Sequence, residues 1–124
     1  GPYLQYTHAR MSGIFRKAAE AGIATTAKPG DLQLLVADEE WALVQKLRGF
    51  SPAVRRAAEQ REPFEVAHYL HELASVFNAF YNRHVVLDEA DPARSQARLA
   101  LVGSTRTVLA SGLTLLGIRP LEYM

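Results

Sequence analysis

Residues 62–81 read EPFEVAHYLHELASVFNAFY, and this stretch points to the fold class. Its apolar residues recur at a period of about 3.6, as they do on one face of an amphipathic helix. Pro63 suits the first turn of that helix, where its missing N–H would have no partner. The pattern predicts a long helix from about residue 62 with one buried face, made of Val66, Tyr69, Leu70, Leu73, Val76, Phe77 and Phe80.

Further helices are predicted on both sides of this stretch. Asp38 and Ser51 are expected to cap two of them, because their side-chain oxygens can accept hydrogen bonds from free backbone amides. Asp91 begins the last and longest helix, and Gly117 is expected to end it. We find no competing strand pattern, so the sequence predicts one helical bundle with a loop at residues 25–30. The other predicted limits are about residues 2–21, 38–49 and a short helix from residue 51.

The composition fits one domain that spans residues 1–124. Hydrophobic residues make up 48% of the chain and charged residues 22%, which is enough apolar material for a single core. The formal net charge is only +1, so total charge does not indicate a nucleic-acid binder. The charge is nevertheless uneven, because basic blocks that include Arg10, Arg16 and Lys17 alternate with acidic ones. Taken alone, this alternation favours solvated helix faces.

The absence of cysteine excludes several classes of protein and site. A chain with no cysteine holds no disulfide scaffold, no thiolate metal site and no cysteine nucleophile. No apolar run reaches the roughly 20 residues that cross a bilayer. The first residues also lack the charged and apolar regions of a secretion signal. We therefore expect a cytoplasmic protein with no membrane partner.

The sequence offers no convincing catalytic or metal-binding arrangement. His68 and His71 lie close to Glu72, but their spacing is not the His-Glu-x-x-His pattern of zinc hydrolases. Both histidines point away from the apolar stripe, which favours solvated histidines over a metal site. The serines that neighbour glycines fall inside predicted helices, where a nucleophile elbow cannot form. We expect no catalytic residue and no metal in this chain.

Arg106 lies at the edge of an apolar stripe on the last predicted helix. The apolar arc of that helix is wide, which suits a helix packed on more than one side. A largely buried charge needs a partner, so we expect Arg106 to pair with a carboxylate from another helix.

The first predicted helix carries a second stripe beside its apolar face. Tyr3, Tyr6 and Arg10 are spaced i, i+3 and i+7, and they lie about 100° around the helix from the centre of that face. Tyr81 has a similar flanking position on the helix that begins near residue 62. Such rings and a guanidinium can stack on unpaired bases and pair with phosphate. Spacing alone favours a simpler interpretation, half-buried tyrosines with solvated hydroxyls.

The segment YLQYTHAR at residues 3–10 resembles the Tyr-x-Gln-Tyr-x-His-[Ala/Ser]-Arg segment of arginyl-tRNA synthetases. In that family the segment opens the C-terminal, DALR-type anticodon-binding domain. The similarity resumes at residues 69–74 and 80–82, and it is densest between residues 97 and 118. It covers nearly the whole chain and weakens between about residues 25 and 61. The resemblance implies an all-α helical bundle of the class I aminoacyl-tRNA synthetase anticodon-binding type.

The resemblance also implies a function and a set of site residues. In the family this bundle binds the anticodon loop of arginine tRNA, and a separate catalytic domain ligates arginine to the tRNA with ATP. The signatures of that nucleotide-binding domain are absent here, so we expect no cofactor in this chain, and ATP and arginine bind the missing domain. The implied partners are arginine tRNA and that catalytic domain, with the protein a monomer. The implied RNA-binding residues are Tyr3, Tyr6, Arg10, Tyr81 and Met124.

Two alternatives remain open at this point. A helical protein-interaction bundle could use the same exposed tyrosines as anchors. The domain could also belong to another class I synthetase, since the cysteine- and methionine-specific enzymes carry comparable bundles, although YLQYTHAR argues against this.

The chain departs from the family pattern at Tyr123, where the family usually has an arginine. That position therefore either loses a phosphate contact or gains a ring.

Overall fold

The computed structural model describes residues 2–23 and 29–124, and these ranges contain five α-helices, one 3₁₀ turn and no β-strand. The all-α prediction is confirmed. Most of the predicted loop at residues 25–30 lies outside the described residues, and its last two residues begin the 3₁₀ turn. The elements are α1 (Pro2–Glu20), η1 (Pro29–Leu34), α2 (Asp38–Arg48), α3 (Phe50–Gln60), α4 (Phe64–Arg83) and α5 (Pro92–Leu115).

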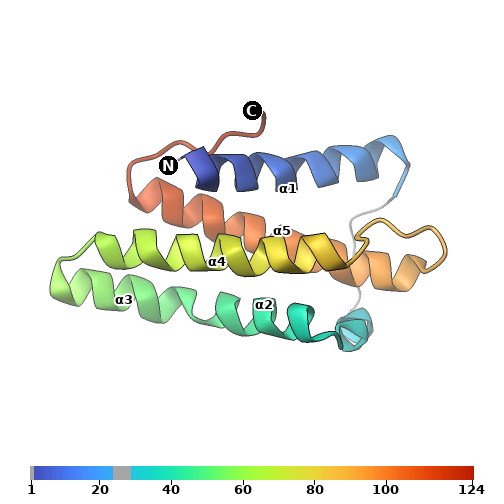
Figure 1. Ribbon diagram of the computed structural model, residues 1–124, viewed down its shortest axis with the longest axis horizontal. Coiled ribbons are helices and arrows are strands. Elements are labelled where there is room, and N and C mark those ends of the chain that lie inside the picture. The colour runs from blue at the N-terminus through green and yellow to red at the C-terminus, as the bar shows by residue number, and fades with distance from the viewer. Residues whose placement is uncertain (1, 24–28) are drawn as a thin grey trace.

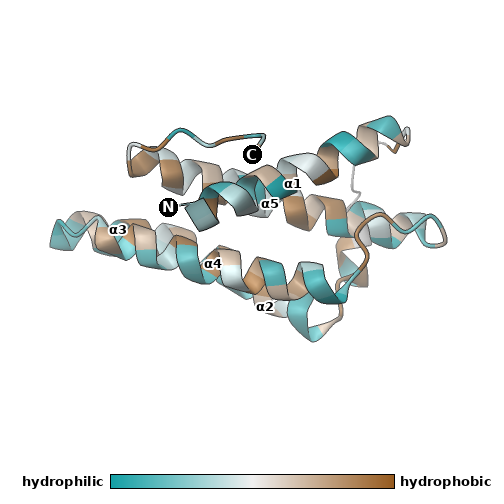
Figure 2. Cartoon of the chain, turned by 45° about the horizontal axis from the view of Figure 1, so that its top comes forward, coloured by the Kyte–Doolittle hydropathy of each residue, from teal (hydrophilic) through white to brown (hydrophobic). Residues whose placement is uncertain are grey.

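Helix α4 lies at the centre of the bundle (Figure 1). It packs against α1 and α5 on one side, and against α2 and α3, which follow each other end to end, on the other. Every helix carries both hydrophobic and hydrophilic residues, as amphipathic packing requires (Figure 2). Four residues of the predicted α4 face have no exposed surface: Leu70, Leu73, Phe77 and Phe80. Burying each such side chain contributes about 1.5–3 kcal/mol.

Both ends of α5 agree with the sequence-based prediction. Pro92 is its first residue, and the carboxylate of Asp91 accepts a hydrogen bond from the amide of Arg94 at 3.2 Å. At the other end Gly117 has a φ of 75°, and the amide of Ile118 bonds back to the carbonyl of Leu113 at 2.9 Å. Glycine adopts this left-handed conformation without steric cost, so the helix ends here.

The two predicted caps at Asp38 and Ser51 are wrong. Ala37 precedes α2, and the side chain of Glu40 accepts a hydrogen bond from its amide at 3.0 Å. The carboxylate of Glu40, inside the first turn, therefore caps the start of α2, which is the role that we expected of Asp38. Gly49 ends α2 and also precedes α3, so Ser51 already lies inside the helix.

A buried ion pair joins α2 to α5. The Nε atom of Arg98 donates to Oε2 of Glu40 at 3.0 Å, although Glu40 is only 1% exposed. The same guanidinium donates from Nη1 to the carbonyl of Val85 at 2.8 Å, in the connection between α4 and α5. Next to this pair, a hydrogen bond from His84 lowers the pKa of the Glu39 carboxyl. Arg98 thus fastens three parts of the chain together.

The prediction for Arg106 is wrong. Within the described residues it pairs with no carboxylate, and its Cζ atom instead lies 4.2 Å from the ring centroid of Phe15. Phe15 is only partly buried, so the guanidinium covers an aromatic face while it keeps contact with water. An arginine with this exposure does not need a counter-ion.

Substitution of Gly112 tests how closely α5 approaches α4. A Cβ atom on Gly112 would lie 2.5 Å from Cδ2 of Leu70, whose side chain is fully buried and has no room to move. We expect Gly112→Ala to lower the free energy of unfolding by about 1 kcal/mol or more, because overpacking costs about 1–3 kcal/mol and outweighs the gain in helix propensity. Urea denaturation measures the change.

Gly13→Ala is the matched control for this prediction. Gly13 also lies inside a helix, but the nearest atom to its Cβ would be Nη2 of Arg16 at 3.4 Å, an ordinary van der Waals distance. This variant should be more stable than the unchanged protein by up to about 1 kcal/mol. Equal unfolding energies for the two variants would contradict the close packing of Gly112 on Leu70.

Candidate functional site

Helices α1 and α4 meet through their apolar faces, and this brings their flanking residues together along one edge. The guanidinium of Arg10 on α1 lies between two tyrosine rings at that edge. Its Cζ atom is 5.0 Å from the ring centroid of Tyr6 and 4.9 Å from that of Tyr81 on α4. The positive charge therefore faces two aromatic surfaces, an attractive arrangement that also fixes the spacing of the rings.

Asn78 holds this arrangement in place. Its Oδ1 atom accepts a hydrogen bond from Nη1 of Arg10 at 2.8 Å. Its Nδ2 atom donates to the hydroxyl of Tyr3 at 3.0 Å and to that of Thr7 at 3.3 Å. The amide thus links Arg10 to Tyr3 on the preceding turns of α1. Our sequence analysis missed Asn78, although its i, i+3 spacing from Tyr81 places both on one side of the helix.

The segment after α5 completes the site. Residues 117–124 run back along α1 (Figure 1), where the side chain of Arg16 contacts them. The Cζ atom of Arg16 lies 4.0 Å from the ring centroid of Tyr123, and its Nη1 atom donates to the carbonyl of Glu122 at 2.9 Å. The ring of Tyr123 is 68% exposed, so one aromatic face is stacked on a cation while much of the ring remains open.

The resulting hollow, which we call the tyrosine–arginine hollow, has a volume of about 280 Å³. Tyr3 lies outside its lining, one turn along α1, where its ring is parallel to that of His71 at 6.1 Å. It is joined to the hollow through Asn78. The structure thus brings four of the five predicted residues into one lining, and their contact with RNA stays a prediction. Those four are Tyr6, Arg10, Tyr81 and Met124.

The hollow carries uncompensated positive charge. Three cations line it, Arg10, Arg16 and Lys17, and its lining contains no carboxylate side chain. In the described part of the chain, none of these three forms an ion pair with an acidic residue. Cations that no acidic side chain neutralises attract phosphate.

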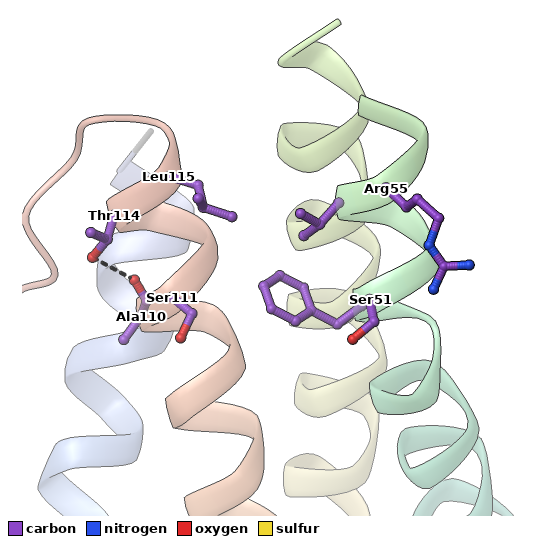
Figure 3. A pocket seen from close by; sticks show the side chains of 8 residues that line it. Ser51, Arg55, Ala110, Ser111, Thr114 and Leu115 are labelled. Carbon is purple, nitrogen blue, oxygen red and sulfur yellow. Dashed lines mark hydrogen bonds between the residues drawn. The ribbon is translucent and has the colours of Figure 1, made fainter. Parts of the chain in front are cut away.

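A larger hollow, of about 610 Å³, lies between α3 and α5 (Figure 3). Phe50, Val54 and Leu115 make it largely apolar, and Arg55 is the charged residue in its lining. It contains no pair of ring and cation like the one at Arg10. The larger hollow therefore differs in chemistry from the smaller, cationic one.

The structure separates the two histidines that we considered as metal ligands. His68 is exposed and its Nε2 atom lies 3.6 Å from Glu72, whereas His71 is stacked on Tyr3. The residues that the structure describes contain no group of three or more histidine, cysteine or acidic side chains suited to a metal ion. Within the same residues, no helix has the length and apolarity that a membrane span requires.

Comparison with known proteins gives consistent results. The profile of the DALR anticodon binding domain matches residues 4–124. The arginine–tRNA ligase of Desulforudis audaxviator is 44% identical over 124 residues, and that of Listeria monocytogenes is 42% identical over 122 residues. Each alignment covers 98% of this chain. The arginyl-tRNA synthetase of Thermus thermophilus superimposes on the whole chain with a TM-score of 0.85 at 41% identity.

The chain spans about a fifth of the length of these relatives. It covers 22% of each of the two ligases and 21% of the Thermus chain. The similarity therefore concerns one part of much longer proteins.

Removal of the Asn78 amide tests whether it organises the site. We expect Asn78→Ala to lower the free energy of unfolding by about 1–3 kcal/mol, because three hydrogen bonds of about 0.5–1.5 kcal/mol each are lost and partly replaced by water. Asn82→Ala is the matched control on an exposed position of the same helix, with an expected change within about 0.5 kcal/mol. Equally small effects in urea denaturation would show that Asn78 does not hold the site.

Proposed function

The chain belongs to the family of DALR anticodon binding domains, and we propose that it recognises the anticodon loop of arginine tRNA as one part of an arginine–tRNA ligase. In this proposal the chain supplies recognition and no catalytic group. ATP and arginine bind elsewhere in the longer protein, and the chain acts as a monomer in the cytoplasm.

The placement of Arg10 between Tyr6 and Tyr81 supports this proposal most directly. Anticodon bases are unpaired, so a protein can reach both their faces and their edges. A base that stacks on an aromatic side chain contributes about 1–3 kcal/mol to binding. Tyr6 is 52% exposed, which leaves ring surface for a base beyond the part that faces Arg10.

The hollow offers separate groups for the separate parts of a nucleotide. Arg16 and Lys17 can attract phosphates without regard to sequence. The hydroxyl of Tyr6 and the free N–H groups of Arg10 can bond base edges, which is where sequence is read. Met124 is 69% exposed and provides a flexible apolar contact. Together these groups could read an unpaired base and hold its backbone.

The first test compares arginine tRNA with a non-cognate tRNA at two salt concentrations. We expect both affinities to fall as salt rises, because the phosphate contacts release counterions. The preference for arginine tRNA should persist at the higher salt, since stacking and base-edge contacts are screened little. Fluorescence anisotropy measures both quantities. Equal affinity for the two tRNAs at both salt concentrations would reject recognition of the anticodon.

The second test removes one ring from the hollow. We expect Tyr6→Ala to weaken binding of arginine tRNA about 5- to 150-fold, the effect of losing one stacked base. Phe64→Ala removes a ring that is 67% exposed near the far end of α4, and it should leave affinity unchanged. Circular dichroism checks that both variants fold. The same affinity for the two variants would show that Tyr6 does not contact the RNA.

A further inference from the structure

The last residues of the chain depend on α1 for their position. Residues 118–124 form no helix or strand, and residues 121–124 are all exposed. Ile118 packs against the core at the start of this segment, whereas the exposed residues 121–124 need other contacts to hold them. We call residues 118–124 the tail. Specific polar contacts, in which side chains of α1 bind backbone groups of the tail, hold it along α1.

Gln5 makes two of these contacts with one side-chain amide. Its Nε2 atom donates to the carbonyl of Arg119 at 2.8 Å, and its Oε1 atom accepts from the amide of Leu121 at 2.9 Å. The amide thus pairs with alternate residues of an extended segment, as a neighbouring strand would. The Nδ1 atom of His8 donates to the carbonyl of Leu121 at 2.6 Å, so side chains of α1 bind both the amide and the carbonyl of that residue.

These contacts set the position of the two residues that follow. Arg16 continues the row on α1, through the carbonyl of Glu122 and the ring of Tyr123. Tyr123 and Met124 then lie in the tyrosine–arginine hollow, beside Tyr6. Neither residue is buried in the core, so the contacts of Gln5 and His8 upstream and of Arg16 beside them hold them there.

We propose that Gln5 is a positioning residue that fastens the tail along α1 and thereby presents Tyr123 and Met124 to the RNA. The contribution to RNA binding rests on the proposed function, whereas the attachment of the tail does not. Gln5 touches no nucleotide in this account and acts through the tail. It is only half-buried, so its substitution leaves the core intact, unlike that of His8, which is 5% exposed.

The attachment can be measured through the two methionines of the chain. With ¹³C-labelled methionine methyls, Met124 reports on the tail, and the fully buried Met11 serves as an internal reference. In Gln5→Ala we expect the Met124 resonance to move to its value in an unstructured peptide, while the Met11 resonance stays unchanged. Gln45→Ala, an exposed glutamine on α2, is the matched control and should move neither resonance.

The effect on RNA is measured with the same variants. We expect Gln5→Ala to weaken binding of arginine tRNA about 5-fold or more, the effect of losing one stacked ring. In a chain that ends after Pro120, Gln5→Ala should cause no further loss, because the residues it positions are already gone. Gln45→Ala should bind as the unchanged protein does.

Each outcome separates the attachment from the function. An unmoved Met124 resonance in Gln5→Ala would overturn the attachment. A moved resonance with unchanged RNA affinity, or additive losses in the shortened chain, would overturn the role in RNA binding. If the unchanged protein did not prefer arginine tRNA, the proposed function would fail and the RNA role would fail with it. The methyl resonances would then still show whether Gln5 holds the tail.

Discussion

Phe77 and Phe80 lie wholly inside the core that α4 shares with its neighbours, and this burial determines which side of each helix faces water. Successive residues in a helix point about 100° apart, so Asn78 and Tyr81 must emerge at the edge of the packed face. The burial of Leu4 and Met11 likewise places the flank of α1 that carries Tyr6 at the edge of its packed face. The position of the tyrosine–arginine hollow therefore follows from core packing.

Arg98 and Arg10 show opposite uses of the same type of side chain. Arg98 is buried and keeps its charge by pairing with Glu40, because an unpaired buried charge would be strongly destabilising. Arg10 is held by neutral groups, the amide of Asn78 and two tyrosine rings. Neutral partners fix its position without cancelling its charge. The first arrangement stabilises the fold, and the second leaves a cation available to a phosphate or base.

The surface we assign to RNA is built from segments at opposite ends of the chain. Gln5 and Arg119 are separated by 114 positions but share a hydrogen bond. This explains why the segment YLQYTHAR contains more than stacking residues. Tyr3, Tyr6 and Arg10 face the hollow or its edge, while Gln5 and His8 face the tail. One helix can serve both purposes because its sides point in different directions.

The sequence by itself determined the all-α fold, the start of α5 at Pro92, its end before Gly117 and the shared flank of Tyr3, Tyr6 and Arg10. These features depend on helix periodicity and capping, which act over a few residues. Helix geometry also indicated the flanking position of Tyr81 on α4, and the resemblance to arginyl-tRNA synthetases added Met124 to the candidate site. Where capping involved a competing side chain, as with Glu40 at the start of α2, the local rule named the wrong residue.

Only the tertiary structure decided which distant groups meet. Glu40 pairs with Arg98, 58 positions away, whereas Arg106 covers Phe15, and no periodicity distinguishes these two arginines. The link from Asn78 to Arg10 and the attachment of the tail by Gln5 are of the same kind. Such contacts depend on how each helix is rotated and how far it slides against its neighbours. That rotation is set by the packing of the whole core, which no short stretch of sequence contains.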